Sequence, residues 1–523
     1  MNVVDSILAH GAAYAPAVLY RDAVLTYGGL KTRVAALASD LLAQAHLKGD
    51  RIGLFSENNP FFVAAYLGVL RAGLVAVPFP VETTREDFAR IALAAGLKRV
   101  LVSARFERQL RSWASGLGVA VQSEEAAQAL PAKGSGPFPE IDANRDLAAL
   151  MFTSGSTGLP KGVMVTHRNL ECNTRDIAAC LELTAEDRVM VVLPFHYCFG
   201  LSLLHTHLLQ GGSLVLNNDF RLFPEAVLRE LQAKECTGFA GVPSTYQILL
   251  RKSRFRQMQF PRLRWLQQAG GKLPNACIQE IATAFPQVRF VVMYGQTEAT
   301  ARLSFLPPTC VLEKLGSIGK GLPSTKLEVI RPDGAPVLPG SEQTGEIVAS
   351  GDNIALGYWN DPLETAKYFD HGRLRTGDLA RVDAEGFIFI VEREREMIKS
   401  GGNRVSAKEV EDVIAELPEV VEVAVVGLPH ELLGETILAG VVPSPAGRIT
   451  PREVMAHCHR RLPPFKRPEA VVFLDALPHN SSGKILKPAL RTLLSRSEPE
   501  TAPLRQHWPG ECPARDSLAT HPV

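Results

Sequence analysis

A glycine- and hydroxyl-rich segment, from Thr153 to Gly162, carries the clearest chemical signal in this sequence. It reads Thr-Ser-Gly-Ser-Thr-Gly-Leu-Pro-Lys-Gly and follows an apolar run from Leu147 to Phe152. Glycines allow backbone N–H groups to face a bound anion, hydroxyls add further donors, and Lys161 adds a positive charge. This combination predicts a loop that binds phosphate groups.

The segment differs from the P-loop of common NTPases, which needs G-x-x-x-x-G-K followed by Ser or Thr and then a helix. Here Pro160 precedes the lysine, Gly162 follows it, and residues 163–166 alternate as in a strand. We therefore expect a loop between two strands, which argues against a Walker-type ATPase. A flexible Gly/Ser linker is the alternative, and the Pro-Lys-Gly ending between apolar strands disfavours it.

A second candidate site follows the apolar run 288–294, where the chain continues Tyr294-Gly295-Gln296-Thr297-Glu298. Ligand sites in α/β sheets lie beyond the carboxyl ends of the strands, so these polar residues are placed to contact a ligand. Glu298 is suited to Mg²⁺, which prefers one or two carboxylates together with phosphate oxygens. Thr297 can donate to phosphate, and Tyr294 can stack on a base. An exposed turn at a strand end is the alternative.

Two shorter motifs are weak when each is taken alone. Thr376-Gly377-Asp378 places a carboxylate after a tight turn, where it can accept from both hydroxyls of a ribose. Ser482-Gly483-Lys484 places a lysine at a flexible turn near the C-terminus. Gly-Asp turns are common and most lysines are exposed, so an ordinary turn and a surface lysine are the default interpretations.

Composition narrows the class of protein. The chain has 523 residues, of which 46% are hydrophobic and 21% charged, with a net charge of +1, so it predicts a globular protein of two to four domains without a basic face for nucleic acid. The eight cysteines form no C-x-x-C pair, which favours reduced thiols and a cytoplasmic location. We expect no signal peptide and no membrane span, because the most apolar stretch, 61–80, is interrupted by Arg71 and Pro78.

Strand and helix signals alternate along the first three hundred residues and predict βαβ units with a largely parallel, buried sheet. The expected strands are 51–55, 74–77, 99–102, 188–193, 213–216, 237–242, 263–268 and 288–294, and the expected helices are 60–71, 87–95, 169–181, 224–234 and 275–285.

The C-terminal third of the sequence shows a different pattern of secondary-structure signals. Short strands at 326–330, 345–349 and 387–391 lie among Gly/Pro turns and predict a small β-subdomain. The charged run 392–396 is either a solvated strand end or a hinge between domains. Beyond it, Ser406 and Glu409 predict a capping box for a helix reaching about Leu417.

Together and in this order, the motifs resemble the adenylate-forming superfamily of acyl- and aryl-CoA synthetases, peptide-synthetase adenylation domains and firefly luciferase. The resemblance covers about residues 10–490. It implies an α/β fold with a large N-terminal domain of stacked α/β sheets plus a β-subdomain, residues 1–392. It also implies a small mobile α+β lid, residues 393–496, with its hinge near 393–396. Residues 497–523 are expected to be a disordered tail.

The resemblance implies an AMP-forming acid–thiol ligase that converts a carboxylic acid and ATP, with Mg²⁺, into an acyl-adenylate and pyrophosphate. The acyl group is then passed to a thiol, with CoA favoured. Lys484 would be the catalytic lysine, Thr297 would contact phosphate and Glu298 would bind the metal. The remaining implied contacts with ATP or AMP are Thr153, Ser154, Gly155, Ser156, Thr157, Gly158, Lys161, Gly271, Tyr294, Gly295, Gln296, Asp378 and Arg393, and those with the acid or CoA are His196, Gly270, Ser400, Gly401 and Gly402.

Three positions depart from the pattern of the superfamily. Arg395 stands at the hinge, where lysine or aspartate is usual, and Glu392 stands where glycine commonly precedes Arg393. Ala407 replaces a frequent proline, which removes a preference for the first helical position.

The substrate remains open at this stage. No acidic residue occurs from Val189 to Gln210, the segment that carries an aspartate for the substrate ammonium in amino-acid-activating relatives, so an acid without a nearby amine is expected. Asp187 and Asp219 are the nearest carboxylates. The acceptor is CoA or the phosphopantetheine of a separate carrier protein. An amino-acid-activating enzyme and a non-catalytic nucleotide-binding module are the competing hypotheses.

Overall fold

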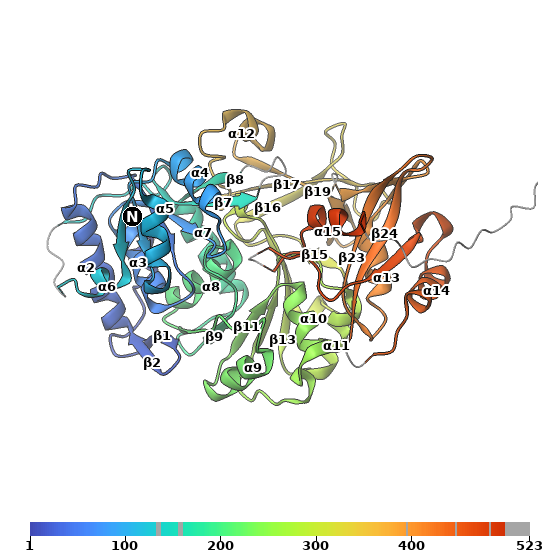
Figure 1. Ribbon diagram of the computed structural model, residues 1–523, viewed down its shortest axis with the longest axis horizontal. Coiled ribbons are helices and arrows are strands. Elements are labelled where there is room, and N and C mark those ends of the chain that lie inside the picture. Colours follow the sequence, from blue (N-terminus) through green and yellow to red (C-terminus); the bar gives the residue numbers. More distant parts are fainter. Residues whose placement is uncertain (132–136, 155–159, 394–395, 445–446, 481–482, 497–523) are drawn as a thin grey trace, which may run out of the picture.

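The computed structural model describes residues 1–131, 137–154, 160–393, 396–444, 447–480 and 483–496. In Figure 1 the chain runs from two α/β sheets on the left and at the bottom, through a β-rich region at the top, to a separate C-terminal sheet on the right. Within the described part of the chain, no helix is both long and apolar enough to cross a bilayer.

One large sheet has eight strands. They are β1 (Pro16–Tyr20), β2 (Ala23–Thr26), β9 (Arg188–Val191), β10 (Ser213–Leu216), β11 (Gly238–Gly241), β12 (Trp265–Gln268), β13 (Arg289–Tyr294) and β14 (Ser304–Leu306). Their order is β14-β13-β12-β11-β9-β10-β1-β2. The central pairs are parallel, and only the edge strands β2 and β14 run antiparallel to their neighbours. The expected parallel, buried sheet is confirmed.

A second sheet has six strands. They are β3 (Arg51–Phe55), β4 (Val75–Phe79), β5 (Arg99–Val102), β6 (Ala120–Ser123), β7 (Leu147–Ser154) and β8 (Pro160–Thr166), in the order β6-β5-β3-β4-β7-β8. Only β7 and β8 pair antiparallel.

Helices cover both faces of both sheets. A middle layer packs against the inner face of each sheet and forms the main core with them: α1 (Val3–Ile7), α2 (Tyr27–Ala43), α3 (Pro60–Arg71), α7 (His167–Cys180) and α8 (Cys198–Leu209). The outer face of the eight-stranded sheet packs on α9 (Pro224–Ala233), α10 (Pro243–Lys252) and α11 (Asn275–Ala284). The outer face of the six-stranded sheet packs on α4 (Arg85–Ala95) and α5 (Glu107–Ala114), and α6 (Glu124–Gln128) follows β6.

A small β-subdomain follows the two large sheets. Its strands are β15 (Ser317–Gly319), β16 (Thr325–Ile330), β17 (Gly345–Gly351), β18 (Phe369–Asp370), β19 (Arg373–Val382) and β20 (Ile388–Arg393), with helix α12 (Pro362–Tyr368) between β17 and β18. The strands pair antiparallel throughout. This confirms the β-subdomain that the turn-rich sequence predicts.

The C-terminal part has its own sheet and core. It contains β21 (Ile398–Ser400), β22 (Asn403–Val405), β23 (Val420–His430), β24 (Gly434–Pro443) and β25 (Ala470–Phe473), with α13 (Ala407–Ile414), α14 (Pro451–Arg461) and α15 (Lys487–Leu494). In Figure 1 this unit lies beside α10 and α11, and β23 contacts α10. The long β23–β24 hairpin was not among the predicted elements.

Local sequence signals explain most of the observed boundaries. The Asn59 side chain accepts from the Phe62 N–H and Pro60 occupies the first turn, so α3 begins where the sequence predicts. Ser406 accepts from the Glu409 N–H as expected, but α13 ends at Ile414 rather than near Leu417. The sequence analysis did not predict helices α8 and α10, nor did it predict α1, α2, α5, α6, α12, α14 and α15. In α8 every residue is buried, so its sequence lacks the polar face that marks an amphipathic helix.

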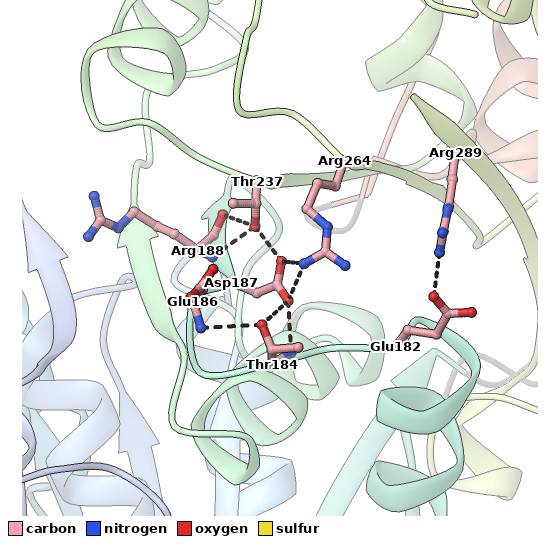
Figure 2. Close-up of polar contacts among 8 residues, drawn as sticks. All are labelled: Glu182, Thr184, Glu186, Asp187, Arg188, Thr237, Arg264 and Arg289. Carbon is pink, nitrogen blue, oxygen red and sulfur yellow. Dashed lines mark hydrogen bonds and ion pairs between the residues drawn. The ribbon is translucent and has the colours of Figure 1, made fainter. Parts of the chain in front are cut away.

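A buried carboxylate joins three strands at the edge of the eight-stranded sheet opposite the candidate site (Figure 2). Asp187, which is 1% exposed, lies just before β9. It accepts from the Thr184 N–H at 2.8 Å and the Thr237 hydroxyl at 2.7 Å, and pairs with Arg264 at 3.0 Å. Thr237 and Arg264 precede β11 and β12, so one side chain fixes the starts of three parallel strands.

We predict that Asp187→Ala lowers the free energy of unfolding by about 3 kcal/mol, because it removes a buried charge partner and leaves buried donors unpaired. Glu182→Ala is the matched control, since its ion pair with Arg289 in the same region is exposed and is expected to contribute less than about 0.5 kcal/mol. Urea denaturation measures both. Equal losses for the two variants would contradict a structural role for Asp187.

Candidate active site

The glycine-rich segment connects two strands, as predicted. Strands β7 and β8 pair antiparallel, with Thr153 opposite Lys161 and Ser154 opposite Pro160. The tip of this hairpin, with the predicted phosphate contacts Gly155, Ser156, Thr157 and Gly158, lies outside the described residues. The Walker-type arrangement of strand, loop and helix is therefore excluded.

Lys161 lies among aromatic and acidic side chains at the base of this hairpin. Its ammonium forms an ion pair with Glu364 and lies 5.4 Å from the centre of the Tyr358 ring and 5.9 Å from that of Tyr368. The Tyr358 hydroxyl donates to Glu298 at 2.8 Å. Tyr358 therefore connects the predicted phosphate lysine to the predicted metal carboxylate.

Glu298 and Thr297 belong to a short 3₁₀ turn, Thr297–Ala299, which follows the carboxyl end of β13. The Glu298 carbonyl accepts from the Ala355 N–H at 3.0 Å, which holds the turn against the neighbouring chain. Burial and the nearby Glu298 carboxylate both raise the pKa of Tyr358, so Tyr358 remains a protonated donor. The Thr297 hydroxyl lies 3.5 Å from the Cys198 sulfur at the start of α8.

The chemistry of this carboxylate fits a magnesium ion. Among the described residues, no group of three or more His, Cys, Asp or Glu side chains is arranged to hold a metal. Mg²⁺ commonly takes only one or two protein carboxylates and completes its octahedron with substrate phosphates and water. A single partly exposed carboxylate at the carboxyl edge of a sheet is therefore sufficient.

Tyr294 and Asp378 form a second polar pair. The Tyr294 hydroxyl donates to the Asp378 carboxylate at 2.6 Å, and both side chains are largely buried. Asp378 lies opposite Arg393 in the β19–β20 register. The fold thus brings together three segments that are distant in sequence, although the side chain of Arg393 lies outside the described residues.

Gly295 and Gln296 occupy a crowded chain crossing. A Cβ atom on Gly295 would lie 2.1 Å from the Ala301 carbonyl oxygen and 2.6 Å from the Arg302 Cα. Glycine is therefore required for the returning chain to pass this close. The side-chain nitrogen of Gln296 is buried and has no hydrogen-bond partner in the described residues.

Lys484 extends from the C-terminal part into the N-terminal part. Its ammonium lies 5.2 Å from the centre of the Tyr197 ring. Two contacts hold its loop in place: the Ser244 hydroxyl donates to the Gly483 carbonyl at 3.0 Å, and the Arg221 guanidinium donates to the Asn480 carbonyl at 3.1 Å. The ion pair between Lys272 and Asp412 joins the same two parts of the protein.

Gly270 and Gly271 form the turn after β12, next to Lys484. Gly270 has φ +85°, and a Cβ atom there would lie 2.6 Å from the Tyr197 hydroxyl and 3.7 Å from the Lys484 side chain. The Gln268 side chain donates to the Gly271 carbonyl at 2.7 Å and fixes the turn. The turn at Gly270 and Gly271 therefore lies next to both Tyr197 and Lys484.

His196 lines a cleft of about 430 Å³ together with Gly483. Burial lowers the pKa of His196 to about 3, so its imidazole is neutral near pH 7. Ser400, Gly401 and Gly402 lie elsewhere, in the β21–β22 hairpin. This hairpin contacts Gly434 and Leu433 of the C-terminal sheet.

Several residues near this point carried no recognised signal in the sequence. Tyr358 and Tyr197 are single tyrosines without a motif of their own, and their roles depend on contacts across the fold. Asp187, one of the two carboxylates nearest to the segment that binds the amine in amino-acid-activating relatives, is fully engaged with Thr184, Thr237 and Arg264.

Comparisons with known proteins agree with this arrangement. Residues 9–359 match the family described as AMP-binding enzyme, and residues 409–484 match the AMP-binding enzyme C-terminal domain. The chain is 35% identical to a feruloyl-CoA synthase of Amycolatopsis sp. over 91% of this chain and 96% of that protein. It is 31% identical to the long-chain-fatty-acid–CoA ligase FadD13 of Mycobacterium tuberculosis over 92% of this chain and 95% of that one.

Solved structures show the same likeness. ATP-bound MatB from Rhodopseudomonas palustris superposes with a TM-score of 0.82 at 26% identity, covering 95% of this chain and 99% of that one. The o-succinylbenzoate CoA synthetase MenE of Bacillus subtilis, in complex with ATP and magnesium ion, gives a TM-score of 0.82 at 27% identity, covering 94% and 99%.

The chain crossing at Gly295 generates a stability prediction. Gly295→Ala should lower the free energy of unfolding by about 3 kcal/mol, because its methyl group meets backbone atoms that cannot move aside. Gly238→Ala in the same sheet is the control: its methyl group would lie 3.7 Å from Val189, an ordinary contact, and should cost less than about 1 kcal/mol. Denaturant unfolding compares them. A Gly295→Ala protein as stable as Gly238→Ala would refute the close approach.

Proposed function

This chain belongs to the AMP-binding enzyme family and is an AMP-forming acid–thiol ligase; we propose that it activates a carboxylic acid lacking an α-amino group and transfers the acyl group to CoA. The observation that carries the proposal is the position of Lys484. A lysine of the C-terminal part lies in the N-terminal part beside Tyr197 and Gly270, close to the strand end that presents Thr297 and Glu298.

The first half-reaction needs positive charge close to the α-phosphate of ATP. A carboxylate is a poor electrophile, and its attack on the α-phosphate of ATP brings two anions together while pyrophosphate leaves. Lys484 would stabilise the charge near the α-phosphate. Lys161 and the segment 153–158 would bind the outer phosphates, and Thr297 would donate to phosphate. Magnesium held by Glu298 would neutralise part of the phosphate charge.

The nucleoside would be held by the residues around β13 and β19. Tyr294 and Gly271 would lie against adenine, with Gly295 and Gln296 beside them. Asp378 and Arg393, which are opposite each other in neighbouring strands, would bind the ribose hydroxyls. The hydrogen bond from Tyr294 to Asp378 would couple the base contact to the ribose contact.

The second half-reaction requires a different face of the C-terminal part. The acceptor thiol attacks the carbonyl carbon of the acyl-adenylate and AMP leaves, a step in which Lys484 has no role. We propose that residues 393–496 rotate as a lid about 393–396 relative to residues 1–392. The rotation would bring Ser400, Gly401 and Gly402 toward the acceptor channel beside His196.

The absence of an amine site supports an acid without an α-amino group. The segment from Val189 to Gln210 carries no acidic residue, and Asp187 is occupied by three structural partners. Burial lowers the pKa of His196, so this residue adds no charge of its own near pH 7. An ammonium group would thus lack a counter-ion from this segment.

Exchange of labelled pyrophosphate into ATP, dependent on Mg²⁺ and on an added organic acid, tests the activation step. Release of AMP on addition of CoA, compared with addition of a phosphopantetheinylated carrier protein, tests the acceptor. Acid-dependent exchange with a CoA-stimulated release of AMP is expected. Exchange that requires an α-amino group, or turnover with the carrier alone, would reverse the proposal.

Lys484→Ala should separate the two half-reactions. Loss of one preorganised contact to the transition state should slow acyl-adenylate formation by about 10²- to 10³-fold. Thioester formation from supplied acyl-adenylate should change little. Lys466→Ala, which removes a lid lysine paired with Glu409, is the control and should leave both rates near the wild-type values. Equal loss of both half-reactions in Lys484→Ala would contradict the assigned role.

The Lys272–Asp412 ion pair gives a test of lid docking. Both side chains are about a quarter exposed, so the pair is expected to contribute about 0.5–1 kcal/mol. Lys272→Met should therefore slow acyl-adenylate formation by about 2- to 5-fold without slowing thioester formation. Lys314→Met, which breaks pairs within the β-subdomain region, is the control. Stopped-flow kinetics measures the rates of both half-reactions. If Lys272→Met slows both to the same extent, the ion pair does not act on lid docking in the first half-reaction alone.

A further inference from the structure

Arg302 is an unusual cation because its whole side chain is buried in the protein. It lies between the 3₁₀ turn that carries Glu298 and strand β14, and it is 1% exposed. Its guanidinium contacts the Met293 sulfur and lies 3.4 Å from the Gln267 side-chain oxygen. Its central carbon lies 4.6 Å from the centre of the Phe199 ring.

No carboxylate among the described residues forms an ion pair with Arg302. A guanidinium has five N–H donors, and here the acceptors are one thioether sulfur and one distant amide oxygen. Burial lowers the pKa of Arg302 to about 9, so the group still carries its charge near pH 7. Burying a charge without a partner is costly, and such groups are normally paired.

The neighbouring amide has the same deficiency. Gln267 lies on β12, is fully buried, and its side-chain nitrogen has no hydrogen-bond partner in the described part of the chain. Its oxygen faces Arg302, so its free N–H donors belong to the same small region. Gln267 thus presents buried N–H donors without an acceptor, next to a guanidinium whose acceptors are a thioether sulfur and one distant amide oxygen.

This region adjoins the proposed reaction centre. The thiol of Cys198 is influenced by the charges of Arg302, Lys484 and Glu298 together, and it accepts from Thr297 at 3.5 Å. Tyr197, the preceding residue, lies under the Lys484 ammonium. The Tyr197 ring centre lies 6.2 Å from that of Phe199, which in turn contacts Arg302, so these two rings at the start of α8 separate the lysine from the buried arginine. The close chain crossing at Gly295 fixes the backbone of Arg302 beside β13.

We infer that Arg302 and Gln267 bind a second carboxylate of the substrate, so that the acid activated by this enzyme is a short dicarboxylic acid. The inference rests on the proposed function, because it assumes that the reacting carboxylate lies at Lys484. The distal carboxylate would then accept from the guanidinium and from the Gln267 amide. An acid with an apolar end would leave both sets of donors unpaired in the same place.

The proximity of the two cations limits the length of the acid. Because only the Tyr197 and Phe199 rings, whose centres are 6.2 Å apart, lie between Lys484 and Arg302, the two carboxylates would be joined by a short linker. A long alkyl chain would have to displace the Phe199 ring or the Met293 side chain, both of which contact the arginine.

The first experiment measures acid-dependent release of AMP with CoA for malonate, succinate, glutarate and adipate. Each is compared with its monomethyl ester, which removes one charge and adds one methyl group. We expect a preference of at least about 10²-fold in kcat/KM for one of the dicarboxylates over its ester, with the optimum among the shorter acids. Equal use of acid and ester across the series, or a preference for alkanoic acids, would overturn the inference.

The second experiment tests the residues themselves. Arg302→Leu should lower kcat/KM for the preferred dicarboxylate by about 10²-fold and raise the relative use of its monomethyl ester. Arg302→Lys, which keeps the charge, should retain part of the preference, and Gln267→Leu should reduce it less. Arg289→Leu, an exposed arginine at the start of β13, is the control and should keep the wild-type preference.

The ratio between acid and ester distinguishes substrate binding from a structural role, because a fold defect alone would lower both rates together. If Arg302→Leu does not fold, dicarboxylate binding is tested instead by the acid-to-ester ratio of Arg302→Lys and by the thermal shift of the wild-type protein with each dicarboxylate. An unchanged ratio in a folded variant would overturn the inference. Release of AMP with monocarboxylic acids alone would also overturn it while leaving the proposed function intact, whereas no acid-dependent AMP release from any acid would mean that the proposed function itself fails.

Discussion

Lys484, a residue of the C-terminal part, reaches a site built on the N-terminal sheets, and the proposed chemistry depends on this contact. Gly270 makes this possible, because its left-handed backbone and missing side chain leave space for Tyr197 and Lys484. Ser244 and Arg221 donate hydrogen bonds to the carbonyls of Gly483 and Asn480. These hydrogen bonds and the partly exposed ion pair can form and break without large cost, which suits the proposed lid movement.

The two ends of the parallel strands in the eight-stranded sheet have different roles. At the start of the parallel strands, Asp187 and its partners hold β9, β11 and β12 together with buried hydrogen bonds. At the opposite ends of β12 and β13, the chain forms the tight turns of Gly270 and Gly295 and presents Thr297 and Glu298. Because the strand starts are held together, the loops at the other edge can present polar groups at fixed positions relative to one another.

Sequence reasoning recovered what is encoded locally. Helix α3 was predicted with its observed bounds because Asn59 and Pro60 mark its start. It failed for α8, whose twelve residues are all buried and show no helical alternation, and for the β23–β24 hairpin. At the site, the motifs were found because each is continuous in sequence. Tyr358, Tyr197 and Arg302 were not, since their significance comes from partners brought near only by the fold.

The first residue of α8 has a further consequence for an enzyme that makes activated acyl groups. Cys198 lies within the influence of Lys484 and Arg302, yet burial raises the pKa of its thiol. Because the thiolate is the nucleophilic form, a neutral thiol reacts slowly with a mixed anhydride. The site thus contains a sulfur atom of its own, and the burial that keeps this sulfur protonated disfavours self-acylation of the protein.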